Sequence, residues 1–244
     1  MSSNQVVLVT GAGSGIGAAV ARSLAADGQV VICADRDAEA AHAVCTEVGA
    51  AQAIALDVSD EDACEASVAE LVAVHGKIDG LVHCAGVWEP ALALTASEES
   101  FDRVVGINLV GTFLLAAVVG RSMIAAGTGG AMVLLASVNA VRADKGQSVY
   151  AASKGGVLML GQVLAMDWAE HGIRVNTIGP GIIDTPMVAS VLHGGDADRL
   201  LSRTPLGRAG QPSEIADAAR FLLSPAASFI TGAFLPVDGG WLAD

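Results

Sequence analysis

Gln5-Val-Val-Leu-Val-Thr10-Gly11-Ala-Gly13-Ser-Gly15-Ile-Gly17 opens the chain with an apolar, β-rich run that stops at a cluster of glycines. A continuous apolar run is typical of a strand that is buried on both faces of a parallel sheet. The alanine-rich segment 18–26 that follows predicts a helix. Strand, glycine turn and helix in this order predict a dinucleotide-binding fold, because glycines let the backbone approach a pyrophosphate at the helix N-terminus. A glycine cluster alone fits a flexible turn equally well, and the flanking strand and helix favour the nucleotide site.

The same alternation of strand and helix continues along the 244 residues without a repeat or a linker. Further strands are predicted at 30–34, 51–56, 78–83, 131–136, 172–178 and 232–238. Helices are predicted at 38–48, 63–75, 149–170 and 212–223, with a long one from Ser97 or Ser100 to about 126, interrupted near 106–111. Seven strands separated by helices predict an α/β fold, a doubly wound (Rossmann) parallel sheet with helices on both faces, as a single domain over 1–244. The irregular segment 184–205 is predicted to be a substrate lid.

Acidic residues stand at the ends of two predicted strands, where a dinucleotide would lie. Asp35 falls about 20 residues beyond the glycines, where a carboxylate accepts hydrogen bonds from the adenosine ribose hydroxyls. Such a carboxylate repels a 2′-phosphate, so the sequence favours NAD over NADP. Arg36 is expected to flank the adenine, and Asp57 to accept from the adenine amino group. The alternative for Asp35 is an N-cap of the next helix.

A candidate acid/base group lies between the fifth strand and the following helix. Ser137 is expected at the end of the strand, and Tyr150 and Lys154 one turn apart on the helix, where residues i and i+4 share a face. A cation beside a phenol favours the phenolate and lowers the pKa of the tyrosine from about 10 towards neutrality. A tyrosine tuned in this way is a general acid/base, and a nearby hydroxyl can bind the oxygen that it protonates. Asn108 lies on the preceding long helix, where a polar residue bonded to neighbouring backbone is a serious competing interpretation.

Composition limits the possible functions. The formal net charge is −13, with 52% hydrophobic and 16% charged residues. This charge argues against nucleic acid and against a strongly acidic protein partner. No continuous apolar run reaches the roughly 18 residues of a membrane span, and the first residues carry no basic stretch typical of a secretory signal. Four cysteines without CxxC spacing or a nearby His cluster indicate reduced thiols rather than a metal site. We therefore expect a cytoplasmic protein with no bound metal.

Taken together, these motifs resemble the short-chain dehydrogenase/reductase (SDR) family. The resemblance covers essentially the whole chain, in order and spacing, from Thr10-Gly-Ala-Gly-Ser-Gly-Ile-Gly17 to Val237-Asp-Gly-Gly240. Between them it rests on Asp57-Val58, Cys84-Ala-Gly86, Asn108, Ser137, Tyr150-x-x-x-Lys154 and Pro180-Gly181. One departure is visible after the fourth strand, where the family has Asn-Asn-Ala-Gly and this chain has His83-Cys84-Ala85-Gly86. A side-chain contact of Cys84 with the cofactor is therefore not expected.

The resemblance implies roles for these residues. Tyr150 would be the catalytic acid/base, Ser137 would hold the substrate oxygen, Lys154 would bind the nicotinamide ribose, and Asn108 would hold a water in a proton relay. The implied cofactor-binding residues are Gly11, Gly13, Ser14, Gly15, Ile16, Gly17, Asp35, Arg36, Asp57, Val58, Cys84, Ala85, Gly86, Tyr150, Lys154, Pro180, Gly181, Ile183 and Thr185. The reaction implied is hydride transfer between nicotinamide and a carbinol or carbonyl carbon. Relatives of this size also imply a homotetramer.

The expected function is an NAD-dependent oxidoreductase acting on a small neutral secondary alcohol or polyol, or on the corresponding ketone. Candidate pocket residues are Trp88, Val138, Asn139, Gln147, Met187 and Leu192. One alternative is a 3-oxoacyl-(acyl-carrier-protein) reductase, disfavoured by Asp35, by the acidic surface, and by Thr128 and His171 instead of arginine at helix ends expected near the mouth. The other is a catalytically silent dinucleotide-binding scaffold, disfavoured because all four catalytic residues are present. The sequence names neither the substrate nor the stereochemistry nor the physiological direction.

Overall fold

Seven parallel strands form one sheet in the computed structural model of this chain, which describes residues 4–192, 194 and 201–243. The strands lie in the order β3-β2-β1-β4-β5-β6-β7. Their bounds are β1 Val6–Thr10, β2 Val30–Asp35, β3 Gln52–Ala55, β4 Gly80–His83, β5 Gly130–Leu135, β6 Ile173–Pro180 and β7 Phe234–Val237. The order reverses between β1 and β4, and in open α/β sheets ligands bind outside the carboxyl ends of the strands at such a point. The predicted doubly wound sheet is confirmed.

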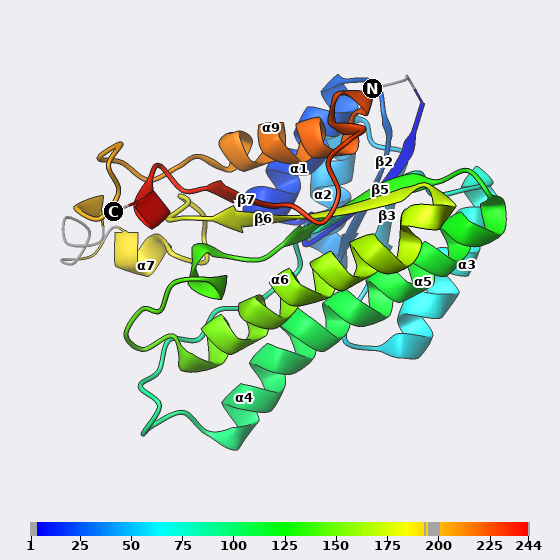
Figure 1. The fold of residues 1–244 in the computed structure, drawn as a ribbon. Coiled ribbons are helices and arrows are strands. Elements are labelled where there is room, and N and C mark those ends of the chain that lie inside the picture. Colours follow the sequence, from blue (N-terminus) through cyan, green and yellow to red (C-terminus); the bar gives the residue numbers. More distant parts are fainter. Residues whose placement is uncertain (1–3, 193, 195–200, 244) are drawn as a thin grey trace.

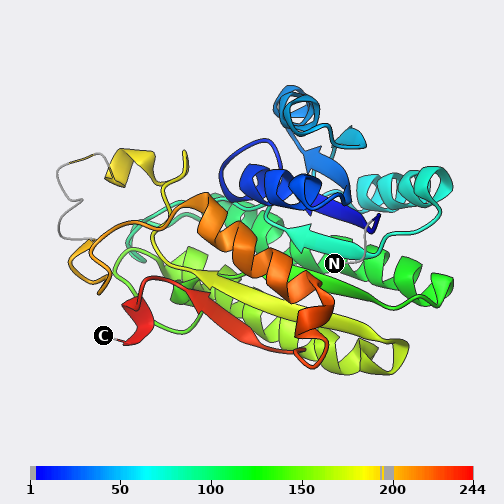
Figure 2. The same cartoon turned by 90° about the horizontal axis from the view of Figure 1, so that it is seen from above.

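Helices cover both faces of this sheet, as Figures 1 and 2 show. On one face lie α1 (Gly15–Ala26), α2 (Ala38–Val48) and α9 (Pro212–Leu223), and on the other α3 (Glu61–His75), α5 (Gly111–Ala126) and α6 (Ser148–Trp168). Leu8 and Val9 are neighbours on β1 and both fully buried, yet they belong to different cores. Successive side chains of a strand point to opposite faces, so a strand covered on both sides must be apolar throughout.

Helix α4 (Glu98–Val105) runs into α5 through a π-helical turn, η1 (Gly106–Val110). Ser97 caps this long helix, because its side chain accepts a hydrogen bond from the Ser100 amide. The interruption predicted near 106–111 is therefore a local widening of the helix rather than a break. Single π-helical turns of this kind occur frequently at functional sites.

A second boundary differs from the prediction. The helix expected at 63–75 begins at Glu61, because Asp60 is its N-cap and accepts from the Ala63 amide. The predicted lid 184–205 is only partly described, since residues 193 and 195–200 lie outside the described residues. Its described part contains α7 (Ala189–Leu192), at the same end of the molecule as the C-terminal segment (Figure 1).

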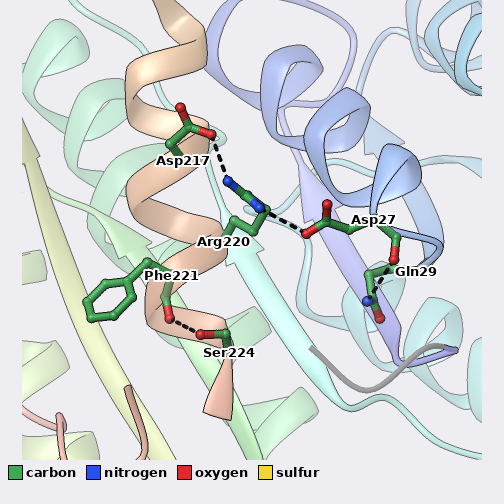
Figure 3. A network of polar contacts seen from close by, with 6 residues as sticks. All are labelled: Asp27, Gln29, Asp217, Arg220, Phe221 and Ser224. Carbon is green, nitrogen blue, oxygen red and sulfur yellow. Dashed lines mark hydrogen bonds and ion pairs between the residues drawn. The ribbon is translucent and has the colours of Figure 1, made fainter. Parts of the chain in front are cut away.

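An arginine on α9 ties this helix to α1 (Figure 3). The Arg220 guanidinium bonds to Asp27, the C-cap of α1, at 3.2 Å and to Asp217 on its own helix at 3.3 Å. Helix α1 is thus held at the end opposite to the glycine turn.

Two helical stretches, Glu98–Ala126 and Ser148–His171, are long and apolar enough to cross a membrane by length and composition, although no continuous apolar run is that long. One side of each packs in the core beneath the sheet, through Leu115 on α5 and Val157 on α6. The other side exposes large apolar residues, among them Phe113, Met159 and Met166. Packing in the core explains why the buried side of each helix is apolar, but it does not explain the apolar residues on the exposed side.

Candidate active site

The glycine turn leads into an uncapped helix N-terminus at the switch point of the sheet. A Cβ at Gly17 would lie 2.1 Å from the Gly11 carbonyl oxygen, so only glycine permits this close packing of turn and helix. Ser14 is the N-cap of α1 but makes no side-chain capping bond, and the first turn has no acidic residue. Its amides and the positive end of the helix dipole therefore remain available to an anion such as a pyrophosphate.

Asp35 is held in place by two backbone amides. Its Oδ2 accepts from Gly13 N and its Oδ1 from Asp37 N, both at 3.0 Å. A Cβ at Gly13 would lie 2.9 Å from Asp35 Oδ2, so glycine is needed for this approach. The alternative interpretation of Asp35 as a helix cap does not hold, because Asp37 is the N-cap of α2 and accepts from the Glu39 and Ala40 amides.

A cavity of about 270 Å³ runs along the carboxyl ends of the strands on this side of the sheet. All the residues predicted for the adenosine and pyrophosphate line it except Gly13, which instead positions Asp35. They are Gly11, Ser14, Gly15, Ile16, Gly17, Asp35, Arg36, Asp57, Val58, Cys84, Ala85 and Gly86. Hydrogen bonds from the Ser59 hydroxyl and amide, at 2.6 and 2.9 Å, lower the pKa of Asp57 and keep this carboxylate ionised.

Thr10 fixes the backbone of the segment that departs from the family pattern. Its hydroxyl accepts from the Cys84 and Ala85 amides, both at 3.2 Å, and lies 3.1 Å from His83 Nδ1. The hydroxyl proton then goes to Nδ1, which assigns the ring proton of His83 to Nε2. Burial lowers the pKa of His83 to about 3, so the ring is neutral. The backbone near Cys84 thus keeps its position without an asparagine, while burial raises the pKa of the Cys84 thiol to about 12.

Ser137, Tyr150 and Lys154 come together just beyond β5. Ser137 is buried, and its Oγ accepts from the Asn139 amide at the start of the short helix η2 (Val138–Ala140). Tyr150 and Lys154 lie one turn apart on α6, with Lys154 Nζ 5.9 Å from the centre of the Tyr150 ring. Lys154 is 5% exposed, and its Nζ donates to the Leu135 carbonyl at 2.7 Å.

Burial dominates the protonation of this group. It raises the pKa of Tyr150, and a hydrogen bond with Ser137 acts in the opposite direction. It lowers the pKa of Lys154 to about 8. The lowering of the Tyr150 pKa that we expected from Lys154 is therefore not visible in the protein alone. A further positive charge near the phenol would be needed to bring the tyrosine towards neutrality.

Asn108 lies fully buried in the π-helical turn and fastens the loop after β4. Its Oδ1 accepts from Val87 N at 2.8 Å, and its Nδ2 donates to Val87 O at 2.9 Å and to Ser153 Oγ at 3.1 Å. A Cβ at Gly86 would lie 3.1 Å from Asn108 Oδ1 and 3.4 Å from Lys154 Nζ. The amide thus joins the β4 loop to α6 beside the lysine. The side-chain amide of Asn108 is thus bonded to backbone groups, as the competing interpretation of this residue predicted.

A second cavity of about 110 Å³ surrounds this group. It is lined by Ser137, Tyr150 and Lys154 together with the four residues predicted to hold the nicotinamide, Pro180, Gly181, Ile183 and Thr185. Thr185 also lines the first cavity, where its side chain lies 3.3 Å from the position that a Cβ on Gly15 would take. The two cavities adjoin, because both are lined by Ile16, Cys84, Gly86, Val87, Thr185 and Met187.

A third cavity of about 140 Å³ opens from Ser137 and Tyr150. Every residue predicted for the substrate lines it: Trp88, Val138, Asn139, Gln147, Met187 and Leu192. Asp144, Arg203 and Trp241 also line it and were not predicted. They come from three distant segments, and no local pattern in the sequence connects them.

These features fit a nicotinamide dinucleotide. The uncapped N-terminus of α1 has free amides that could bind a pyrophosphate. Glycine at position 17 lets the turn and the helix pack closely, where a side chain would collide with the backbone. The Asp35 carboxylate is held in a position where it could accept hydrogen bonds from ribose hydroxyls. Among residues 4–192, 194 and 201–243, no group of three or more His, Cys, Asp or Glu side chains could hold a metal ion.

Comparison with known proteins identifies the class. The family model described as enoyl-(acyl carrier protein) reductase matches residues 11–242. The chain is 43% identical to galactitol 2-dehydrogenase (L-tagatose-forming) of Cereibacter sphaeroides, over 96% of this chain and 93% of that protein. It is 42% identical to D-threitol dehydrogenase of Mycolicibacterium smegmatis, over 97% and 92%. A gluconate 5-dehydrogenase of Burkholderia cenocepacia, solved with NADP and tartrate, superposes with a TM-score of 0.94 at 34% identity, over 99% and 96%.

The chain therefore belongs to the short-chain dehydrogenase/reductase family, and it is an oxidoreductase of that family. The family resemblance read from the motifs is confirmed.

Proposed function

We propose that this protein is an NAD-dependent dehydrogenase that oxidises a secondary hydroxyl of a small neutral polyol, or reduces the corresponding ketone. The observation that carries the proposal is the third cavity. It shares Ser137 and Tyr150 with the adjoining nicotinamide cavity and adds the polar side chains of Asn139 and Gln147. The relatives named for galactitol and threitol support a polyol as substrate.

The preference for NAD rests on the way Asp35 is held. Both carboxylate oxygens bond to backbone amides, so the side chain is not free to swing away from the cavity. Each oxygen keeps a lone pair for a ribose hydroxyl, while the negative charge opposes a 2′-phosphate. The similar gluconate 5-dehydrogenase structure contains NADP, so the cofactor has to be tested on this chain.

The side chains divide the chemistry among them. Bound nicotinamide would supply the hydride acceptor in alcohol oxidation. Tyr150 takes the proton of the reacting hydroxyl, and Ser137 holds the same oxygen through its hydroxyl. Lys154 would hold the nicotinamide ribose, and its positive charge favours the phenolate. A bound cationic nicotinamide would act in the same direction and oppose the effect of burial on the pKa of Tyr150.

The proposed proton relay through Asn108 needs one refinement. The side-chain amide already bonds to Val87 and Ser153, which engages its oxygen and both hydrogens. The backbone carbonyl of Asn108 accepts from Thr112 Oγ1 and has a second lone pair. We therefore assign the water-binding role to this carbonyl and a positioning role to the amide.

Two of the three observations that argued against a carrier-protein reductase still hold. Asp35 and the net charge of −13 still count against NADPH and against an acidic carrier. The argument from Thr128 and His171 was wrong, because these residues precede β5 and β6 and so lie at the opposite edge of the sheet from the site. The scaffold alternative is disfavoured by the meeting of Ser137, Tyr150 and Lys154 around one cavity.

Steady-state assays with NAD and NADP in parallel test the proposal. The panel contains glycerol, threitol, xylitol, galactitol, simple secondary alcohols and the sugar acids threonate and gluconate. We expect the highest kcat/KM with a neutral polyol and NAD. A preference for NADP would refute the role of Asp35, and turnover of sugar acids alone would refute the neutral polyol.

Replacing Tyr150 tests the catalytic assignment within the same assays. We expect Tyr150→Phe to lose turnover by a factor of about 10³ or more, because the proton acceptor is gone. Binding of NADH, measured by fluorescence titration, should stay within about twofold of the wild-type value. Retained turnover would contradict the assignment of Tyr150.

We further propose that the exposed apolar side of α5 and α6 contacts a second copy of the chain. Met166 on α6 is 80% exposed and Phe113 on α5 is 49% exposed. Large apolar residues gathered on two neighbouring helices are typical of an interface. Light scattering should give a multimer, with a tetramer expected from the family resemblance. Met166→Arg should reduce the mass, whereas Val74→Arg on α3 should not; an unchanged mass for Met166→Arg would contradict this interface.

A further inference from the structure

An ion pair forms part of the wall of the substrate cavity. Arg203 Nη1 lies 3.2 Å from Asp144 Oδ1, and about one third of each side chain is exposed. Asp144 lies in the loop before α6, and Arg203 lies in the described C-terminal part, 201–205, of the predicted lid. Neither residue belongs to the family motifs, and the proposed chemistry uses neither of them.

Trp241 holds this pair in position. The guanidinium carbon of Arg203 lies over the Trp241 ring, 4.4 Å from its centre, and that of Arg142 lies 5.1 Å from it. Arg142 Nη1 also donates to the Trp241 carbonyl at 3.0 Å. Trp241 is only 4% exposed. A guanidinium over a buried indole is attracted by its π face, so Arg203 has a defined position.

Both charged groups keep hydrogen-bonding capacity. The bonds of Asp144 from Lys145 N and Arg203 Nη1 both go to Oδ1. In the part of the chain that the structure describes, Asp144 Oδ2 and Arg203 Nη2 have no partner. Nearby, Trp88 Nε1 donates to Gln147 Oε1 at 2.7 Å. This bond fixes the orientation of the Gln147 amide and leaves its NH₂ group as a hydrogen-bond donor. The wall thus presents acceptors and donors together.

The position of the pair separates it from the reacting atoms. Ser137, Tyr150, Gly181, Met187 and Val188 line both the nicotinamide cavity and the substrate cavity. Asp144, Arg203 and Trp241 line only the substrate cavity. A substrate whose reacting carbon lies at Tyr150 therefore meets the ion pair with its remote end.

We propose that Asp144 and Arg203 together recognise hydroxyl groups at the remote end of a polyol, and so select polyhydroxylated neutral substrates. This inference rests on the proposed dehydrogenase function and specifies its substrate. A hydroxyl is both donor and acceptor, so it can donate to Asp144 Oδ2 and accept from Arg203. Hydrogen bonds to charged groups are the stronger ones, and a site built to make them rejects an analogue without the hydroxyl.

The charge balance argues against an anionic substrate. Arg203 alone would suit a carboxylate, but the carboxylate of Asp144 neutralises it at 3.2 Å and would repel a second negative charge. An acyl chain is also a poor match, because its apolar end would leave both charges without hydrogen bonds.

The test compares the polyol that the wild-type enzyme oxidises best with 2,3-butanediol, which has vicinal hydroxyls at the reacting end and none beyond. The variants are Asp144→Asn, Arg203→Gln and the double variant. We expect each single variant to lose about tenfold or more kcat/KM for the polyol relative to 2,3-butanediol. The double variant should lose clearly less than the product of the two single losses, because the two residues act as a unit.

Lys145→Gln is the matched control, since it removes a charge beside Asp144 from a residue outside the cavity wall. Its substrate preference should not change. Thermal unfolding and NADH titration verify that each variant is folded, and Arg203→Lys replaces Arg203→Gln if the latter does not fold. Equal losses for both substrates would overturn the inference. A wild-type enzyme that oxidises 2,3-butanediol but no polyol would overturn it as well. Failure to oxidise any alcohol would refute the proposed function itself.

Discussion

At the scale of single residues, opposing influences set the protonation of Tyr150. Burial favours the neutral phenol, while the Ser137 hydroxyl favours the phenolate. The sequence predicted the presence and spacing of these groups, because i and i+4 on a helix is a local relation. It could not predict the depth of burial, which depends on the β5 and β6 segments packed around them.

Ser137→Ala should move the acid side of the pH profile for alcohol oxidation to higher pH. The hydrogen bond from Ser137 lowers the pKa of Tyr150, so its loss lets burial raise that pKa further. Oxidation needs the deprotonated phenol, and activity should therefore appear at higher pH than in the wild type. The measurement is kcat against pH at saturating substrate. A lower kcat with an unmoved profile would assign Ser137 to substrate binding alone.

Asp35→Asn should reduce NADH affinity about tenfold and bring the Kd values for NADH and NADPH closer together. The amide keeps the size of the side chain but loses a negative charge and one acceptor, so ribose hydroxyls bind less well and a 2′-phosphate is repelled less. Fluorescence titration with both cofactors measures this change. Asp37→Asn is the control, because asparagine also caps a helix well. An unchanged ratio of the two Kd values in Asp35→Asn would contradict the prediction.

At the scale of elements, hydrophobic patterning predicted each strand and the interruption of the long helix. It could not show that the interruption is a π-helical turn, whose Asn108 bonds to a loop 21 residues earlier in the sequence. Nor could it place Asp144, Arg203 and Trp241 in one wall. Contacts between residues 144, 203 and 241 join segments that lie far apart in the sequence, so no local pattern predicts them.

Asn108→Ala should lower the free energy of unfolding by about 2–4 kcal/mol. The change leaves the part-buried Val87 amide and carbonyl without their partner, and an unsatisfied buried group costs about 1–3 kcal/mol. Urea unfolding measures the effect. Asn139→Ala serves as the control, since the Asn139 amide has no side-chain bond to the described residues. A loss in Asn108→Ala no larger than in Asn139→Ala would show that the π-helical turn does not depend on this side chain.

At the scale of the whole molecule, two cores lie on the two faces of one sheet, and His83 at the end of β4 is a buried titratable ring. Its side chain contacts Thr10 and is 1% exposed. Its pKa of about 3 in the folded chain lies below the ordinary 6.5. Between these values the unfolded chain binds a proton that the folded chain does not bind. Below pH 6.5 this difference lowers the free energy of unfolding, by about 1.4 kcal/mol for each pH unit, and above pH 6.5 it has no effect.

His83→Asn should therefore flatten the fall of stability between pH 6.5 and pH 4. Asparagine has no proton to gain, and its side chain can still bond to Thr10. The measurement is the free energy of unfolding in urea at several pH values, taken as the difference between variant and wild type. His42→Asn, at an exposed position on α2, is the control. Parallel curves for wild type and His83→Asn would contradict the buried neutral ring.

The double anchoring of Asp35 also limits how this enzyme can evolve. One carboxylate fixes the Gly13 turn and the start of the α2 connection while it lines the cavity along the strand ends. A mutation that removes it to admit a 2′-phosphate also removes the acceptor of the Gly13 and Asp37 amides. We therefore expect a change of cofactor preference through residue 35 to require a compensating change in the glycine turn or at residue 37, so that cofactor preference and the conformation of this loop change together.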